Sequence, residues 1–236
     1  MRELIVNFAD IHIKIHTNYD YMHKLCKDYI VDTNEYDMEV YPGDDYKHFM
    51  DDNPIYTEAY CESVSLYEQI GKQLPFYNAF LMHGAVITYK DKALMFTAQS
   101  GTGKSTHIKL WKQRFKSDVD IVNGDKPIVR VFEDGIKVFG TPFCGKERWH
   151  KNRSAYLHSI CIIQQALENE IARISSEDAI LPLYQQIYLS KENEEVACKQ
   201  LALFDQLLSL IPVYKLKCNM SIEAAEVAYK GMFDNE

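Results

Sequence analysis

The chain has 236 residues, of which 47% are hydrophobic, and its 26 lysines and arginines stand against 34 aspartates and glutamates, for a formal net charge of −8. This acidic balance argues against a protein whose whole surface binds nucleic acid or anionic lipid, so any anion site must be local. The six cysteines form no C-x-x-C pair, and no apolar run approaches the roughly 20 residues of a membrane helix. We therefore expect a cytoplasmic protein with neither a membrane nor a nucleic-acid partner.

Residues 1–74 are expected to form a small α/β unit, called the N-terminal lobe below. Apolar and polar residues alternate over 3–16, which predicts two short strands or one bulged strand. The pattern further predicts a helix over 19–30, a strand over 38–41, a solvated loop over 44–53 and a helix over 57–70. We place a domain boundary at Leu74-Pro75.

Residues 75–236 are expected to form the main domain. Apolar runs on either side of the charged turns K-D-K and E-D-G predict two hairpins, and a third is suggested by 156–163 and 171–174. A short apolar run over 119–122 predicts a further strand, as does 213–217. Helices are expected over 105–115, 177–188, 193–210 and 222–232. The fold class is therefore mixed α/β with largely antiparallel sheets and flanking helices.

Residues 98–105 read A-Q-S-G-T-G-K-S, which fits the phosphate-binding loop G-x-x-x-x-G-K-[ST] except that Ala98 replaces the first glycine. Gly101 and Gly103 free the backbone so that consecutive N–H groups can surround a phosphate, Lys104 can reach its oxygens, and Ser105 can ligate Mg²⁺. A glycine-rich turn that happens to contain Lys-Ser is the alternative, but a strand pattern before the loop and a helix pattern after it favour nucleotide binding. The predicted nucleotide-binding residues are Ala98, Gln99, Ser100, Gly101, Thr102, Gly103, Lys104, Ser105 and Thr106.

Asp125 is the candidate for the carboxylate that phosphoryl transfer needs. It ends the apolar run of 119–122 in I-V-N-G-D, where it can hold Mg²⁺ or accept the proton of an attacking hydroxyl. The alternative is an ordinary turn aspartate, because N-G-D is a common turn sequence. His83 is expected on the strand that the K-D-K turn folds against the loop, and by itself it reads more readily as a hydrogen-bonded core residue than as a catalyst.

A basic segment over 145–153, G-K-E-R-W-H-K-N-R, stands out in an acidic chain. Lys146, Arg148 and Arg153 are candidates for binding a phosphoryl group or an acidic substrate, and a merely solvated loop fits equally well. Glu147 within it is a candidate additional metal ligand beside Ser105 and Asp125.

The stretch from H-G-A-V at 83–86 to S-G-T-G-K-S-T at 100–106 resembles the HPr kinase/phosphorylase family and its smaller serine-kinase relatives, which share a core with ATP-dependent phosphoenolpyruvate carboxykinase. The resemblance covers about residues 75–235. It implies a kinase that moves the γ-phosphoryl of ATP to a serine, with Asp125 as the proton acceptor, His83 and Lys104 in the active site, and Mg²⁺ as cofactor. The family commonly has two adjacent acidic residues where this chain has Gly124-Asp125, which favours kinase chemistry alone.

The expected function is thus Mg-ATP-dependent transfer to a serine of a peptide, protein or small molecule, with the oligomeric state left open. A small-metabolite kinase and a nucleotide-sensing binding module without turnover are the alternatives. A mononucleotide kinase or ATPase on a parallel sheet fits less well because hairpins flank the loop. A carboxykinase would need a larger chain with more metal ligands.

Overall fold

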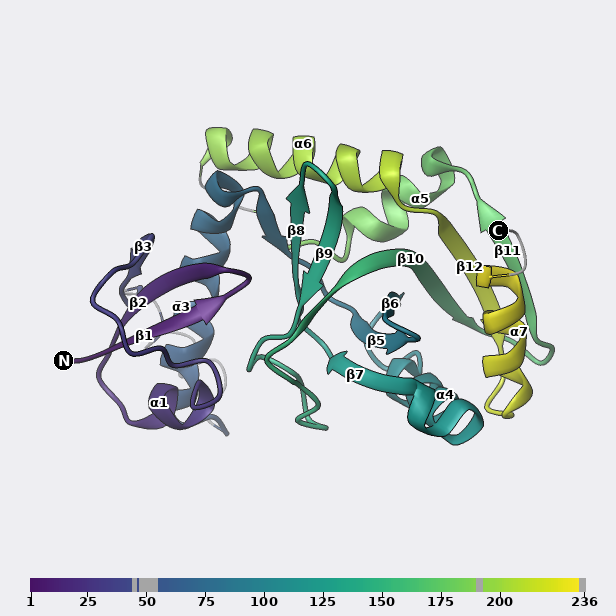
Figure 1. The fold of residues 1–236 in the computed structure, drawn as a ribbon, viewed down its shortest axis with the longest axis horizontal. Helices are drawn as coiled ribbons and strands as arrows, with labels where there is room; N and C mark the ends of the chain where they lie inside the picture. Colours follow the sequence, from purple (N-terminus) through teal and green to yellow (C-terminus); the bar gives the residue numbers. More distant parts are fainter. Residues whose placement is uncertain (44–45, 47–54, 190–192, 234–236) are drawn as a thin grey trace.

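The computed structural model describes residues 1–43, 46, 55–189 and 193–233. The predicted loop over 44–53 lies, apart from residue 46, outside these residues. The N-terminal lobe and the C-terminal helix occupy opposite ends of the molecule, and α6 runs along one side between them (Figure 1). None of the described helices is long and apolar enough to cross a membrane.

The described part of the N-terminal lobe contains a three-stranded sheet and the helices α1 and α3. The strands are β1 (Arg2–Phe8), β2 (Ile11–Thr17) and β3 (Met38–Val40), and they lie in the order β1-β2-β3. The helices are α1 (Tyr21–Leu25) and α3 (Glu58–Gln73). The two strands expected over 3–16 are confirmed, but the helix expected over 19–30 is much shorter. The chain leaves α1 after Leu25 so that Tyr29 can pack edge-on against Phe8, at 5.3 Å between ring centroids, and Ile30 can bridge to Val6. Tertiary packing therefore overrides the helical period there.

The main sheet has nine strands. Its central path runs β4-β8-β9-β10-β6-β5-β7, while β12 pairs with β10 and β11 pairs with β12. The strands β4 to β12 are, in chain order, Ala79–Leu81, Ala85–Tyr89, Lys92–Thr97, Val119–Asn123, Ile128–Phe132, Gly135–Phe139, Ser154–Gln165, Glu170–Ile174 and Val213–Cys218. The helices are α4 Lys104–Phe115, α5 Ser176–Tyr184, α6 Glu194–Leu210 and α7 Glu223–Phe233, and the 3-10 turns are Leu74–Tyr77 and Lys116–Asp118.

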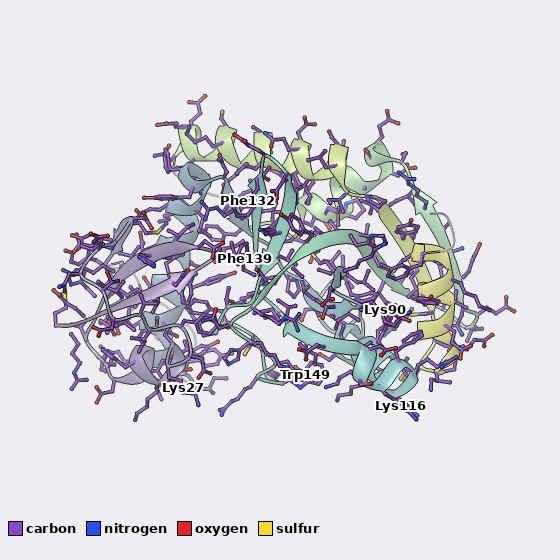
Figure 2. The ribbon with its side chains drawn as sticks, in the orientation of Figure 1. Lys27, Lys90, Lys116, Phe132, Phe139 and Trp149 are labelled. Atoms are coloured by element: carbon purple, nitrogen blue, oxygen red, sulfur yellow. The ribbon has the colours of Figure 1, made fainter. Side chains whose placement is uncertain are left out.

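Most of the strand pairs are antiparallel, as expected for the mixed α/β class. The hairpins β5-β6 and β8-β9 are confirmed, and Phe132 and Phe139 of the second lie between the N-terminal lobe and the rest of the sheet (Figure 2). The suggested third hairpin is wrong, because β12 inserts between β10 and β11, parallel to the first and antiparallel to the second. The reason is burial: β12 is the more apolar strand and takes the inner position, whereas β11 carries exposed Glu170 and Arg173 at the edge.

Three apolar clusters fill the molecule. Alternate residues of β5 and β6 point to opposite faces of the sheet, with Val86 and Met95 toward the α5 and α6 side and Ile87 and Phe96 toward the α4 and α7 side. The third cluster joins the N-terminal lobe to β4, β8 and β9 through Ala79, Leu81, Ile128 and Phe139. The division at residue 74 stays a prediction, and the two parts share this continuous core.

Candidate active site

The predicted site residues gather at one edge of the main sheet because of strand direction. β5 lies between β6 and β7 and is antiparallel to both, so Ala85 at its start pairs with Phe96 while Val86 pairs with Asn123. The residues just before β5 and just after β6 and β7 therefore meet. These are His83, the loop 98–103 and residues 124–126, which we call the site edge.

The loop 98–103 has the backbone that its glycines predict. Gly101 and Gly103 have φ of +82° and +112°, in the region that only glycine adopts without strain, and a Cβ at either would meet no atom within 4 Å. The glycines are thus required by conformation and not by crowding. Helix α4 begins directly after Gly103, with Ser105 and Thr106 half-buried in its first turn, so the N–H groups of its N-terminus face the loop.

Lys104 is buried beneath this loop. Its Nζ donates to the carbonyl oxygen of Ala98 at 3.0 Å, and both residues are less than a tenth exposed. Burial lowers the pKa of Lys104, and the nearby charge of Asp125 partly opposes this. A buried ammonium with one neutral partner is poised to bind an anion.

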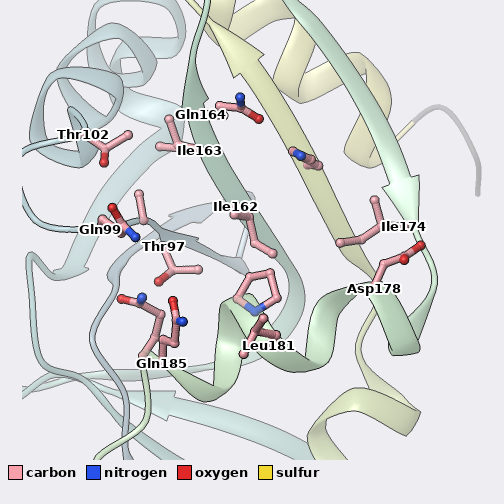
Figure 3. A pocket seen from close by; sticks show the side chains of 14 residues that line it. Thr97, Gln99, Thr102, Ile162, Ile163, Gln164, Ile174, Asp178, Leu181 and Gln185 are labelled. Carbon is pink, nitrogen blue, oxygen red and sulfur yellow. The ribbon is translucent and has the colours of Figure 1, made fainter.

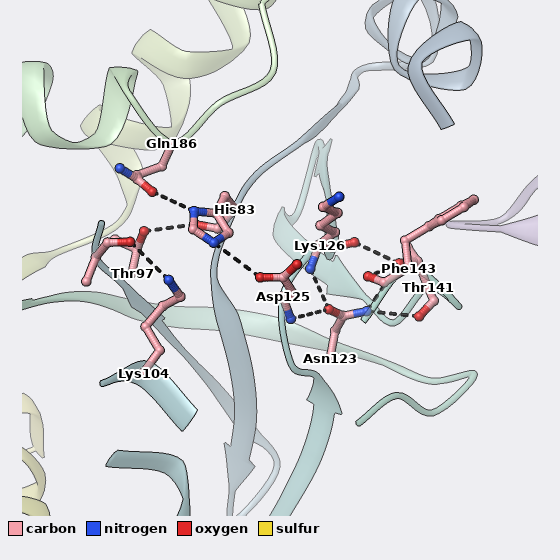
Figure 4. A network of polar contacts seen from close by, with 10 residues as sticks. His83, Thr97, Lys104, Asn123, Asp125, Lys126, Thr141, Phe143 and Gln186 are labelled. Carbon is pink, nitrogen blue, oxygen red and sulfur yellow. Dashed lines mark hydrogen bonds and ion pairs between the residues drawn. The ribbon is translucent and has the colours of Figure 1, made fainter. Parts of the chain in front are cut away.

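His83 joins the site edge to the segment after α5. It lies in the break between β4 and β5, so the expectation that it sits within a strand is wrong; its carbonyl oxygen accepts a hydrogen bond from Thr97 Oγ1 at 2.8 Å. His83 Nε2 lies 3.2 Å from Asp125 Oδ1, and its Nδ1 lies 2.9 Å from Gln186 Oε1 (Figure 4).

Two protonation arrangements satisfy this geometry. With the Gln186 amide oxygen facing Nδ1, both ring nitrogens of His83 carry hydrogens and the ring is a cation. With the amide rotated by half a turn, the ring is neutral and its hydrogen is on Nε2. In either arrangement His83 Nε2 donates to the Asp125 carboxylate.

Asp125 is held by the turn that follows β7. The Oδ1 atom of the fully buried Asn123 accepts from the backbone N–H groups of Asp125 at 2.8 Å and Lys126 at 2.7 Å, while its amide donates to Thr141. Gly84 N donates to the Asp125 carbonyl at 2.8 Å, which fixes the turn against the start of β5. The carboxylate is therefore positioned by a rigid backbone.

The charge of Asp125 is set by opposing effects. Burial is the largest single effect and raises its pKa, whereas the hydrogen bond and charge of His83 lower it. The positive charges of Lys126 and Lys104 act in the same direction, so the net pKa lies below the ordinary aspartate value and the side chain is an anion at neutral pH. Among the described residues nothing donates a hydrogen bond to its Oδ2 atom.

The basic segment lies partly beside this carboxylate. Gly145 packs on Asp125 so closely that a Cβ on the glycine would lie 3.3 Å from the carboxyl carbon. Lys146, Glu147 and Arg148 follow it and are exposed. Arg153 has another partner, because its Nη1 lies 2.6 Å from Oδ2 of Asp120 on β7, so its charge is neutralised away from the loop.

Mg²⁺ commonly takes only one or two protein oxygens and completes its shell with phosphate oxygens and water. The ionised Asp125 carboxylate and the Ser105 hydroxyl are donors of this kind. Within the described ranges no three residues from His, Cys, Asp and Glu cluster closely enough to hold a metal ion by themselves. The predicted contribution of Glu147 therefore stays a prediction.

Two pockets adjoin the site edge. The larger, of about 630 Å³, is bounded by Thr97, Ala98, Gln99 and Thr102 on one side and by apolar residues of β10 and α5 on the other (Figure 3). The smaller, of about 290 Å³, lies between α3 and His83. Gln185 and Gln186 line both pockets, so this pair of amides forms part of the wall that separates them.

Gln186 and Asn123 were missed from the sequence as site residues. Gln186 comes from a segment after α5 with no motif of its own, and only the fold brings it to His83. Asn123 had a signal, because an asparagine that precedes Gly-Asp after a strand often accepts backbone hydrogen bonds in such turns.

No protein-family model and no curated protein sequence matches this chain. Among solved structures, the Hpr(Ser) kinase/phosphatase from Coxiella burnetii resembles it with a TM-score of 0.37 and 9% sequence identity, over 66% of this chain and 97% of that chain. A likeness at this level is a distant structural relationship.

Proposed function

We propose that this chain is a Mg-ATP-dependent kinase that transfers the γ-phosphoryl group to a serine hydroxyl of a peptide, protein or small molecule. The observation that supports it most is the contact of 3.2 Å between His83 and the ionised Asp125 at the same sheet edge as the glycine loop and Lys104. Perturbed charges of opposite sign beside a phosphate-type loop are typical of phosphoryl-transfer sites.

In the proposed reaction the serine oxygen attacks the γ-phosphorus while the bond from that phosphorus to the β-phosphate oxygen breaks. Asp125 takes the hydroxyl proton through Oδ2, because Oδ1 is engaged by His83. Lys104 and the N–H groups of the loop 98–106 stabilise the charge on the phosphate oxygens. Ser105 and Asp125 would hold Mg²⁺, which would supply further positive charge for the phosphate oxygens.

The larger pocket is assigned to the nucleoside. Its volume of about 630 Å³ lies in the ordinary range for small-molecule sites, and it opens beside the loop residues Ala98, Gln99 and Thr102. Ile162, Leu181 and Pro182 offer apolar surface for a base, and Gln164 and Gln185 offer hydrogen-bonding groups.

A nucleotide-sensing module without transfer is the second candidate, and Gly124 favours it. A Cβ at this position would lie 3.2 Å from the carbonyl oxygen of Cys144 and 3.2 Å from Trp149 Cβ. A second carboxylate beside Asp125 is thus disfavoured by packing, which leaves one acidic group for both metal binding and proton transfer.

The Asp125→Asn variant separates the two candidates. Under the kinase proposal it loses phosphoryl transfer by about a hundredfold or more and retains ATP binding, because general-base catalysis typically contributes that much. Transfer is measured by mass spectrometry of serine-containing acceptors incubated with ATP. Asp134→Asn, in the exposed turn of the β8-β9 hairpin, is the matched control. Retained transfer in Asp125→Asn contradicts the assigned role, and a wild-type protein that binds ATP without any transfer supports the sensing module.

A further inference from the structure

The smaller pocket connects the N-terminal lobe to the site edge. Its walls include Val64 and Tyr67 from α3, His83 and Lys126 from the site edge, and Tyr188 from the segment after α5. Its volume of about 290 Å³ is at the low end for ligand sites, which suits one amino-acid-sized group and not a nucleotide.

Helix α3 presents one side to this region. Tyr60, Val64 and Tyr67 share a face of the helix by their spacing. Burial raises the pKa of Tyr60 and Tyr67, and in both cases the negative charge of Asp125 adds to the effect. The N-terminal lobe therefore forms one wall of the smaller pocket, and the charge of Asp125, the proposed base, acts on the side chains of that wall.

Lys126 provides the positive charge of this pocket. It follows Asp125 directly and is half-buried, with Nζ 5.0 Å from the centroid of the Tyr67 ring. Among the described residues it forms no ion pair. A half-buried ammonium held against an aromatic face can bind a carboxylate that enters the pocket, where it acts against the negative charges of Glu68 on the pocket wall and of the neighbouring Asp125.

The two pockets divide the expected ligands. The larger one touches the glycine loop, and the smaller one touches His83 and Lys126. Asp125 lines neither pocket, but it contacts His83 at 3.2 Å and directly precedes Lys126 in the chain. The smaller pocket therefore offers a hydroxyl a place beside the two neighbours of Asp125, apart from the pocket assigned to the nucleoside, and phosphoryl transfer needs both groups at one site.

We propose that the smaller pocket is the acceptor site and that Lys126 selects a serine with a carboxylate close to its hydroxyl. This rests on the proposed kinase function. The carboxylate belongs either to free serine itself or to an acidic residue beside serine in a peptide, and both present the same chemistry to Lys126. The N-terminal lobe then serves to close the acceptor site, with Tyr67 holding the lysine in place.

The experiment compares acceptors that differ only in charge, using the full chain. Free L-serine is paired with L-serinamide, and a heptapeptide with Asp beside a central Ser is paired with its Asn counterpart. Binding is measured by calorimetry with Mg²⁺ and a non-hydrolysable ATP analogue, and transfer is measured with ATP. We expect the acidic member of one pair to bind and react about tenfold better or more, which is typical for a hydrogen bond to a charged group.

Lys126→Met keeps the apolar stem and removes the charge, and it should abolish this preference by raising KM for the acidic acceptor about tenfold. Lys126→Arg should keep the preference. Lys137→Met is the matched control, because Lys137 also lies over aromatic rings, at 4.9 Å from Phe132 and 4.6 Å from Tyr156, but lines neither pocket. Affinity for the ATP analogue should be the same in all variants.

The assignment is overturned if the wild-type protein does not distinguish the two members of either pair, or if the Lys126→Met variant keeps the preference. It is also overturned if Lys126→Met loses affinity for the ATP analogue instead, because Lys126 would then contact the nucleotide. Binding of an acidic ligand that depends on Lys126 but is never followed by transfer supports carboxylate binding by Lys126 and contradicts the kinase function. The peptide and free-serine pairs identify the source of the carboxylate.

Discussion

The imidazole of His83 donates through Nε2 to Oδ1 of Asp125 across 3.2 Å and thereby joins the break between β4 and β5 to the end of β7. One contact does two things. It occupies one oxygen of the carboxylate, which leaves Oδ2 for an incoming hydroxyl, and it counteracts the burial that would otherwise raise the pKa of Asp125.

Replacing His83 by Asn should lower kcat for phosphoryl transfer about tenfold to a hundredfold, the range found for residues that orient the ligands of metal sites. Burial of Asp125 then acts unopposed by the imidazole, so its pKa rises and the acid limb of kcat against pH moves to higher pH. His83→Gln places an amide nitrogen nearer to Nε2 and should restore part of the rate. Equal losses in both variants, with no movement of the acid limb, contradict this role.

Gln186 should act as a positioning residue through His83. Gln186→Leu removes the 2.9 Å partner of His83 Nδ1, whereas Gln186→Glu keeps a side-chain oxygen that can contact it. We expect the Leu variant to lose kcat several-fold and to alter the nitrogen chemical shifts of His83 in NMR spectra. The Glu variant should retain the imidazole orientation. Unchanged His83 shifts in both variants would show that the amide does not fix the ring.

The glycine loop could be predicted from the sequence because its geometry is local. The positive φ angles of Gly101 and Gly103 and the helix that begins at Lys104 depend on residues within the motif itself. The strand after it, with Asp125 at its end, could also be predicted, since a short apolar run stops at turn residues. The loop and the aspartate come together only through the antiparallel order β6-β5-β7. The K-D-K hairpin predicted the pairing of β5 with β6, but nothing in the sequence predicted the pairing of β5 with β7.

The rest depended on contacts between distant segments. The sequence suggested that β11 pairs with β10, because the two strands are adjacent in the chain. In the structure β11 pairs with β12, since the more apolar β12 takes the inner position beside β10. Gln186 reaches His83 through a segment without any periodic pattern. The partner of Arg153 could not be predicted either, because a basic stretch does not show that Asp120 on β7, with two strands between them in the chain, lies 2.6 Å from the guanidinium.

Lys104→Met should weaken ATP binding at least tenfold without lowering stability. In the ligand-free protein burial lowers the pKa of Lys104, so the folded state disfavours the charge that the unfolded chain keeps at neutral pH. Removing the charge relieves this cost and offsets the lost hydrogen bond to Ala98. Nucleotide titration and urea unfolding measure the two effects, with exposed Lys112→Met on the same helix as the control. A large loss of stability would mean that Lys104 is a structural residue.

Gly124→Asp should fail to add a working second carboxylate. The Cys144 carbonyl oxygen and Trp149 must shift to accept any Cβ, because both would lie 3.2 Å from it. We expect a loss of about 1–3 kcal/mol in the free energy of unfolding, as is usual for overpacking, and no gain in transfer. Gly124→Ala has the same steric effect without the charge, so comparing the two variants by urea unfolding isolates the carboxylate. A variant with Asp at this position that is stable and faster would contradict the packing argument.

His107 should make the protein sensitive to acid. It lies in α4 behind the glycine loop, where its Nε2 accepts from Trp111 Nε1 at 2.9 Å, so the ring hydrogen is on Nδ1, which has no hydrogen-bond partner among the described residues. Burial lowers the pKa of His107 to about 4, from the ordinary histidine value of 6.5. Between these values the unfolded chain binds a proton that the folded protein does not, so stability falls as the pH decreases. The loss amounts to about 3 kcal/mol between pH 7 and pH 4.

The His107→Gln variant tests this effect because the amide oxygen can still accept from Trp111 but cannot titrate. At pH 7 it should be slightly less stable than the wild type, by about 1 kcal/mol, owing to imperfect packing. Below pH 6.5 its free energy of unfolding should fall less steeply, so the two curves cross as the pH approaches 4. Urea unfolding at intervals of pH measures both curves, and His12→Gln on β2 controls for the loss of a histidine elsewhere. Parallel curves for the wild type and His107→Gln would mean that the ring takes up its proton in the folded state as readily as in the unfolded chain, which would require the added hydrogen on Nε2 to displace the bond from Trp111.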